Sequence, residues 1–262
     1  MKKIVSKDGT VIAYDQTGSG PVIILVDGAL CSRLFGPMKT LAPLLSQHFT
    51  VFAYDRRGRG DSSDQKPYSV DREIEDIQAL IDVAEGSAFL FGISSGAALV
   101  LHAVAKGLNI SKIGLYEPPF VGDEEGKRPP SDYQARVTEL ISLDKRNEAV
   151  QLFLSVVGAP AFAVFIMRLL PLWRKLKDIA HTLPYDAAIM GNFSAPTQRA
   201  AAVKIPALVM SGEKSPQSLR NAASKLAKSI PQAKYSELAG QTHNVSTKVL
   251  APVLIEFFIN KE

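Results

Sequence analysis

The chain has 262 residues, enough to bury one large core or a core that carries an inserted subdomain. Its composition, 46% hydrophobic and 21% charged, is that of a globular protein and excludes a disordered or fibrous chain. The net charge of +4 comes from 30 basic and 26 acidic residues spread along the sequence, so we expect no nucleic-acid partner. The single cysteine, Cys31, excludes an intrachain disulfide and fits a reducing compartment.

Two stretches bear on the location of the protein. Lys2 and Lys3 are not followed by an apolar stretch of about 7–15 residues, so we expect no signal peptide and a cytoplasmic protein. The most apolar region, Val156 to Trp173, is interrupted by Arg168 and two prolines and falls short of about 20 clean apolar residues. We therefore expect no membrane partner.

Strands and helices alternate through the first 122 residues. Asp8-Gly9 predicts the turn of a hairpin between Lys2–Ser6 and Val11–Thr17. Continuous apolar runs predict buried strands of a mostly parallel sheet, at Val22–Val26, Phe49–Tyr54, Ala88–Phe91 and Lys112–Tyr116. Apolar residues at helical spacing predict helices between these strands, at Gly36–His48, Asp71–Ala84 and Ser95–Lys106.

The pattern changes between residues 123 and 202, where no clear strand is found. Helical periodicity predicts helices here, at Asp132–Leu143, Asn147–Val157, Phe162–Ala180 and Tyr185–Phe193. Alternation then resumes, with strands at Ala207–Met210 and Lys234–Leu238 and helices at Gln217–Ser229 and Lys248–Ile259. The sequence predicts an α/β fold: a mostly parallel, doubly wound sheet domain (residues 1–122 and 203–262) with an all-helical cap inserted at 123–202.

The pentapeptide Gly92-Ile93-Ser94-Ser95-Gly96 lies between a predicted strand and a predicted helix. A serine on such a tight turn is pushed out of the backbone, and glycines fit on both sides because neighbouring segments come close. Ser94 is therefore the predicted nucleophile. Ser95 is a weaker candidate, because the positions two residues before and after it hold Ile93 and Ala97, which fit a tight turn less well than glycine. A hydrogen-bonded turn serine without a catalytic role is the alternative.

A serine hydroxyl is a poor nucleophile unless a base takes its proton. His243 follows a predicted strand and lies in a polar loop, so we expect it to be that base. The other three histidines have other surroundings: His48 ends a helix, His102 lies inside the helix after the pentapeptide, and His181 lies in the predicted cap. We expect these three to have structural roles.

Four motifs together resemble the α/β-hydrolase superfamily, in its capped esterase and haloperoxidase-like branch, over essentially the whole chain. They are the pentapeptide at 92–96, Asp27-Gly28-Ala29 after the third strand, the loop Asp55-Arg-Arg-Gly-Arg-Gly-Asp-Ser62, and Gly240-Gln-Thr-His243 after the last strand. The resemblance implies an oxyanion hole formed by the backbone N–H groups of Ser95 and Ala29. It departs at Asp27, where the family usually has a histidine. We expect Asp27 to brace the loop by hydrogen bonds and to point away from the oxyanion.

The acid that would orient the histidine is left open. Ser215 stands where the resemblance leads us to expect an aspartate, and a serine cannot stabilise an imidazolium by its charge. Glu117, at the end of the sixth strand, and Glu213, in the usual loop but two residues early, both keep the chain order serine, acid, histidine. We favour Glu117 over Glu213, with Asp123 third. A serine–histidine pair without an acid is the remaining alternative.

Two further stretches carry structural predictions. The arginines of the loop at 55–62, Arg56, Arg57 and Arg59, are expected to fix that loop through ion pairs with Asp55, Asp61 or Asp64. The apolar stretch Phe162–Leu170 is expected to pack the cap on the sheet domain or to form a homodimer contact, and it is equally suited to wall the substrate site.

These residues and the resemblance imply a serine hydrolase that cleaves a small apolar carboxylic ester or related acyl compound through an acyl-enzyme. Its partner is then a small apolar molecule, and no metal or organic cofactor is expected. A cofactor-free lyase that uses the same serine and histidine is one alternative. A non-catalytic ligand-binding protein with a decayed site is another, supported by Ser215 and Asp27.

Overall fold

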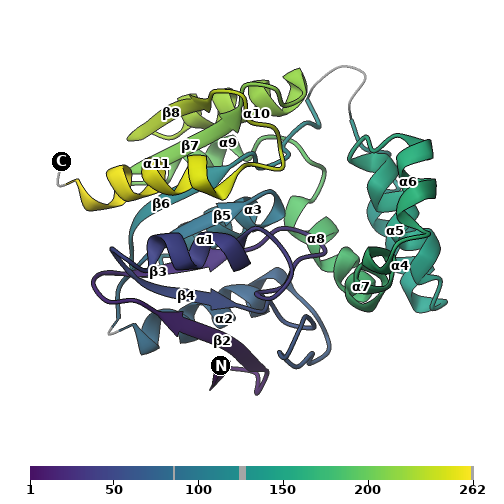
Figure 1. Ribbon diagram of the computed structural model, residues 1–262, viewed down its shortest axis with the longest axis horizontal. Helices are drawn as coiled ribbons and strands as arrows, with labels where there is room; N and C mark the ends of the chain where they lie inside the picture. The colour runs from purple at the N-terminus through teal and green to yellow at the C-terminus, as the bar shows by residue number, and fades with distance from the viewer. Residues whose placement is uncertain (85, 124–127, 261–262) are drawn as a thin grey trace.

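The computed structural model describes residues 1–84, 86–123 and 128–260. Within these residues eight strands form one sheet in the order β1-β2-β4-β3-β5-β6-β7-β8 (Figure 1). β1 and β2 pair antiparallel, β2 also pairs antiparallel with β4, and every later pair is parallel. The predicted α/β fold with a mostly parallel sheet is therefore confirmed. Residues 124–127 of the predicted cap lie outside the described residues.

The strands lie where the apolar runs predicted them, with ends that differ by a few residues. They are β1 (Lys2–Val5), β2 (Val11–Thr17), β3 (Val22–Val26), β4 (Thr50–Tyr54), β5 (Ala88–Ile93), β6 (Ile110–Tyr116), β7 (Ala207–Gly212) and β8 (Ala233–Leu238). β3 and β5 lie in the middle of the sheet and are almost wholly buried, which explains why their sequences have no polar alternation.

Helices cover both faces of the sheet, and the alternation of side chains along β3 separates the two layers. Ile24 and Val26 belong to the core beneath α2 (Val70–Val83), α3 (Ser95–Ala105) and α10 (Gln217–Ser229). Ile23 and Leu25 belong to the opposite core, beneath α1 (Met38–Leu45) and α11 (Thr247–Ile259). In this doubly wound arrangement the carboxyl ends of the parallel strands lie together at one edge of the sheet.

One group of the helices between β6 and β7, called the cap helices below, lies to one side of the sheet (Figure 1). The cap helices are α4 (Tyr133–Ser142), α5 (Arg146–Val156), α6 (Ala161–Met167), α7 (Pro171–Ile179) and α8 (Leu183–Met190). They share an apolar cluster around Val137, Val150 and Trp173. α8 joins this cluster to the sheet domain, because it packs against α2 and α3 as well as α4.

The structure corrects the predicted cap in two places. The single helix predicted at Phe162–Ala180 is wrong: the chain breaks into α6 and α7, because Pro171 favours an extended conformation at Leu170, with φ −97° and ψ 152°. The short helix α9 (Thr197–Ala201) has too few residues to show a periodicity, and it packs on α3 and α10.

The predicted packing of the stretch 162–170 against the sheet domain is also wrong. The side chains of Phe162, Phe165 and Leu169 are 71%, 63% and 74% exposed. α6 has no buried residue and packs chiefly on α5.

Of the helices that the structure describes, none combines the length and the apolar character that crossing a bilayer requires.

Candidate active site

Ser94 occupies a strained turn between β5 and α3. Its φ of 55° and ψ of −128° lie in a region that a non-glycine residue rarely adopts, so the surrounding contacts must hold the turn in place. A Cβ on Gly92 would lie 2.6 Å from the carbonyl oxygen of Gly96, and a Cβ on Gly96 would overlap the carbonyl oxygen of Val26. The two glycines of the pentapeptide are therefore required by close backbone approach, as the sequence predicted.

Glu117 directly follows β6, and its fully buried carboxylate binds His243. His243 Nδ1 donates a hydrogen bond to Glu117 Oε2 at 2.7 Å. The other carboxylate oxygen, Oε1, accepts the backbone N–H of Gly212 at 2.7 Å. Both oxygens of this buried charge are thus partnered, as burial of an ionised group demands. The hydrogen bond at Nδ1 leaves Nε2 of His243 on the side of the ring away from the carboxylate.

Tyr116 connects the serine turn to the histidine loop. Its backbone oxygen accepts the N–H of Ser94 at 2.9 Å, and its hydroxyl donates to the backbone oxygen of Thr242 at 2.7 Å. Ser94, Glu117 and His243 therefore extend from the ends of β5, β6 and β8 at one edge of the sheet. Within the described part of the chain Ser94 Oγ makes no hydrogen bond, including none to His243. Both side chains are partly exposed.

The other candidate acids have partners of their own. Glu213 Oε2 accepts the backbone N–H of Gly240 at 2.7 Å, and Asp123 pairs with Lys225 at 3.2 Å. Ser215, at the position where the resemblance suggested an aspartate, is buried, and its hydroxyl has no partner among the described residues. Of the candidate acids, Glu117 is the one that the structure brings to His243.

The loop after β3 lies against Ser94. A Cβ on Gly28 would lie 3.0 Å from the Cβ of Ser94, so the loop comes closest where it has no side chain. In the part of the chain that the structure describes, the backbone N–H groups of Ala29 and Ser95 donate no hydrogen bond. Both are the amides that the sequence predicted for an oxyanion hole, and both are free to receive an acceptor.

Asp27 departs from its predicted role. It is buried, and neither carboxylate oxygen has a hydrogen-bond partner among the described residues, so the predicted bracing of the loop by hydrogen bonds is wrong. Oδ2 lies beside Gly36. Burial, only partly offset by the positive charges of Arg59 and Arg56, raises the pKa of Asp27 to about 8. The carboxyl group is therefore mainly neutral at pH 7.

The arginines of the loop 55–62 are buried in ion pairs, but not with the predicted partners. Arg56 binds Glu73 and Asp186, Arg57 binds Asp8 and Asp76, and Arg59 binds Asp186. The predicted partners Asp55 and Asp61 pair instead with Arg33, which the sequence analysis missed. Asp64 pairs with Lys66. The actual partners lie up to 130 positions away along the chain, so spacing in the sequence gave no signal for them.

Two of the remaining histidines, His102 and His181, lie in largely buried surroundings, whereas His48 is exposed. His102 Nε2 lies 3.0 Å from the backbone oxygen of Ile189, and burial lowers its pKa. Burial also lowers the pKa of His181. No three His, Cys, Asp or Glu side chains of the described residues are grouped so that they could share a metal ion.

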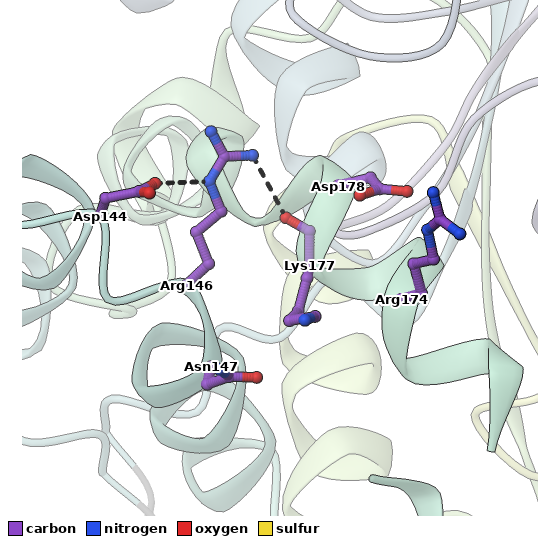
Figure 2. Close-up of a pocket in the computed structure, with 6 residues that line it drawn as sticks. All are labelled: Asp144, Arg146, Asn147, Arg174, Lys177 and Asp178. Atoms are coloured by element: carbon purple, nitrogen blue, oxygen red, sulfur yellow. Dashed lines mark hydrogen bonds and ion pairs between the residues drawn. The ribbon is translucent and has the colours of Figure 1, made fainter. Parts of the chain in front are cut away.

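A polar pocket of about 330 Å³ lies in the cap (Figure 2). Its lining consists of charged and amide side chains from α5, α7 and the turn before α5: Asp144, Arg146, Asn147, Arg174, Lys177 and Asp178. Arg146 Nε donates to Asp144 at 2.9 Å, as the figure shows. The lining includes none of the residues predicted for catalysis.

A mostly parallel sheet that presents a serine on a strained strand-to-helix turn is the architecture of the α/β hydrolases. The sequence pattern of the alpha/beta hydrolase family matches residues 18–248, and the chain belongs to this family. The chain is 48% identical to an alpha/beta hydrolase from Sphaerobacter thermophilus DSM 20745, whose crystal structure matches with a TM-score of 0.91 over 98% of this chain and 100% of that chain.

Two more distant similarities were also found, one in sequence and one in fold. The chain is 35% identical over 97 residues to the uncharacterized hydrolase YraK of Bacillus subtilis (strain 168), a match that covers 36% of this chain and 35% of that protein. The chain thus spans about a third of the length of this curated relative. A thermophilic esterase from Thermogutta terrifontis is 20% identical and has a TM-score of 0.70 over 98% of this chain and 97% of that chain, which shows a shared fold.

Proposed function

We propose that this α/β hydrolase is a serine hydrolase that cleaves a small apolar carboxylic ester or a related acyl compound. The observation that carries the proposal is the 2.7 Å hydrogen bond from His243 to the buried carboxylate of Glu117, beside the strained turn of Ser94. A buried acid, a histidine that it orients and a partly exposed serine on a tight turn are the parts that acyl transfer requires.

Each residue then has a defined task in the reaction. Because Nδ1 of His243 donates to Glu117, Nε2 carries the lone pair and accepts the proton of Ser94 as Oγ attacks the carbonyl carbon. Glu117 stabilises the resulting imidazolium. The imidazolium returns the proton to the leaving alcohol, and water, activated by the same nitrogen, releases the acyl group from Ser94.

The N–H groups of Ala29 and Ser95 would receive the negative oxygen of the tetrahedral intermediate. Both are free of other hydrogen bonds among the described residues. Preorganised donors of this kind lower the barrier because they need no reorganisation as the charge develops. Asp27 does not oppose this at pH 7, because its raised pKa of about 8 keeps it mainly neutral.

An apolar substrate is supported by the surroundings of the loop after β3. Leu30 is buried in the apolar cluster of the cap helices, and Ala29, Phe35 and Phe193 pack against that cluster. An apolar acyl or alcohol group placed beside Ala29 would therefore meet apolar surface.

A fluorophosphonate probe and a panel of short esters test the proposal. We expect the probe to label the native protein and the Ser94→Ala variant to lose both labelling and ester turnover. Ser215→Ala is the control: it removes a buried hydroxyl that has no partner among the described residues, and the variant should be labelled normally. Labelling that persists in Ser94→Ala would assign the nucleophile elsewhere. Normal labelling without ester turnover would favour the lyase alternative.

A further inference from the structure

We propose that Asp186, on the cap helix α8, is a positioning residue that holds both N–H groups of the oxyanion hole in place. The inference rests on the proposed function, because it concerns the same Ser95 and Ala29 amides. It adds a role for a residue of the cap, which contributes none of the groups assigned to the chemistry above.

The carboxylate of Asp186 accepts hydrogen bonds from three side chains, one on α3 and two in the loop 55–62. Oδ1 accepts the hydroxyl of Ser95 at 2.7 Å and Nη1 of Arg56 at 2.8 Å. Oδ2 accepts Nη2 of Arg59 at 2.7 Å. Burial by itself would raise the pKa of Asp186, but the charges of Arg59 and Arg56 and the Ser95 hydrogen bond hold it below its ordinary value. The group is therefore an anion at neutral pH.

The contact with Ser95 fixes the first half of the oxyanion hole. Ser95 is the first residue of α3 and directly follows Ser94, so its N–H has no acceptor within the helix and points out of the helix end. The hydrogen bond from its hydroxyl to Asp186 ties this residue to α8. The same bond directs the hydroxyl proton of Ser95 to a buried carboxylate, which separates Ser95 from the nucleophile Ser94.

The contact with Arg59 fixes the second half of the oxyanion hole, the N–H of Ala29. Arg59 Nη1 donates to the backbone oxygen of Gly28 at 2.6 Å, while Nη2 of the same guanidinium binds Asp186. The oxygen of Gly28 and the N–H of Ala29 belong to one peptide group, and in a trans peptide they point in opposite directions. By holding the oxygen, Arg59 turns the N–H of Ala29 away from itself and toward the opposite side of the loop.

Asp186 matters more to Arg59 than to Arg56. Arg56 also binds Glu73 through two hydrogen bonds of 2.7 Å, which do not depend on Asp186. For Arg59, Asp186 is the one carboxylate with which it pairs in the described part of the chain. Removal of this charge leaves a buried guanidinium without a counter-ion, a costly state that drives the side chain to move. The peptide between Gly28 and Ala29 would move with it.

The test compares Asp186→Asn with Asp76→Asn. Asp76 is a matched control, because it is equally buried and pairs with Arg57 of the same loop at 2.7 Å, but touches neither amide. The outright loss of one oxyanion donor lowers the rate by about 10²–10³-fold. In Asp186→Asn the two donors are displaced but still present, so we expect a smaller fall in kcat, about 10–100-fold. KM should change by less than about threefold, and fluorophosphonate labelling of Ser94 should slow in parallel. Asp76→Asn should lower the Tm while kcat stays within about twofold.

Ser95→Ala keeps the proposal testable if Asp186→Asn does not fold. It removes one hydrogen bond to Asp186 and leaves both arginine pairs intact, so we expect a fall of about 3–10-fold in kcat and a Ser95→Thr variant that restores most of it. If the native protein is not labelled at Ser94, the proposed function fails. If the native protein is labelled, and Asp186→Asn and Ser95→Ala react at the native rate, the role of Asp186 alone is refuted.

Discussion

Glu117→Gln separates the charge of the acid from its shape. The amide is nearly isosteric with the carboxylate, but one of its two terminal atoms becomes a donor. Glu117 Oε1 accepts the N–H of Gly212 at 2.7 Å, so the amide oxygen must stay on that side and the NH₂ must face His243. Nδ1 of His243, now facing a donor, must accept a hydrogen bond, and the ring proton moves to Nε2. Nε2 then has no lone pair to take the proton of Ser94.

The expected effect is large because the wrong tautomer predominates. Replacement of a triad aspartate by asparagine, with geometry preserved, lowers kcat by about 10⁴ in a serine protease, which corresponds to about 5.5 kcal/mol of transition-state stabilisation. We expect a fall of about 10³–10⁴-fold in kcat for Glu117→Gln, measured with the best ester of the panel. The Tm should change little, since the hydrogen bond from Gly212 is retained.

Glu213→Gln is the control for this experiment. Glu213 lies in the exposed loop after β7 and binds the backbone N–H of Gly240, so its amide variant should keep kcat within about threefold. A Glu117→Gln variant with near-native kcat would refute the assignment of Glu117 as the orienting acid. A large loss in Glu213→Gln, with Glu117→Gln active, would instead support the acid that we did not favour.

The remaining predictions concern the strained turn and the buried carboxyl group. Gly96→Ala should lower the free energy of unfolding, measured with urea, by about 1–3 kcal/mol and should also lower kcat, because the new Cβ overlaps the carbonyl oxygen of Val26. Gly107→Ala is the control: it is strained only through its φ of 80°, so it should lose stability and keep its kcat. The folded state keeps a proton on Asp27 up to about pH 8, whereas the unfolded chain loses it near pH 4. The contribution of Asp27 to stability therefore falls between these values as pH rises, and Asp27→Asn should gain Tm relative to the native protein from pH 5 to pH 9. Parallel Tm curves for the two proteins would contradict this.

Much of the fold was predictable from sequence because its signals are local. Apolar runs such as Val22–Val26 reflect burial on both faces of a sheet, and helical spacing reflects one buried face. The turn at Ser94 was equally predictable, because the glycines at 92 and 96 report on contacts within a few residues and the adjoining strand. The position of His243 after the last strand followed from the order of the elements.

Only the tertiary structure decided which distant groups meet. Glu117 and Glu213 both satisfy the order of residues in the chain, and the difference between them arises from where packing places each carboxylate relative to His243. Asp186 joins Arg56 and Arg59 across about 130 positions, and no periodicity or spacing encodes such a pair. The same holds for α6, whose Phe162, Phe165 and Ile166 look like core in the sequence and are exposed in the fold. Local patterns specify which segments are strands or helices, whereas burial and charge pairing depend on how remote segments pack, which is a property of the whole chain.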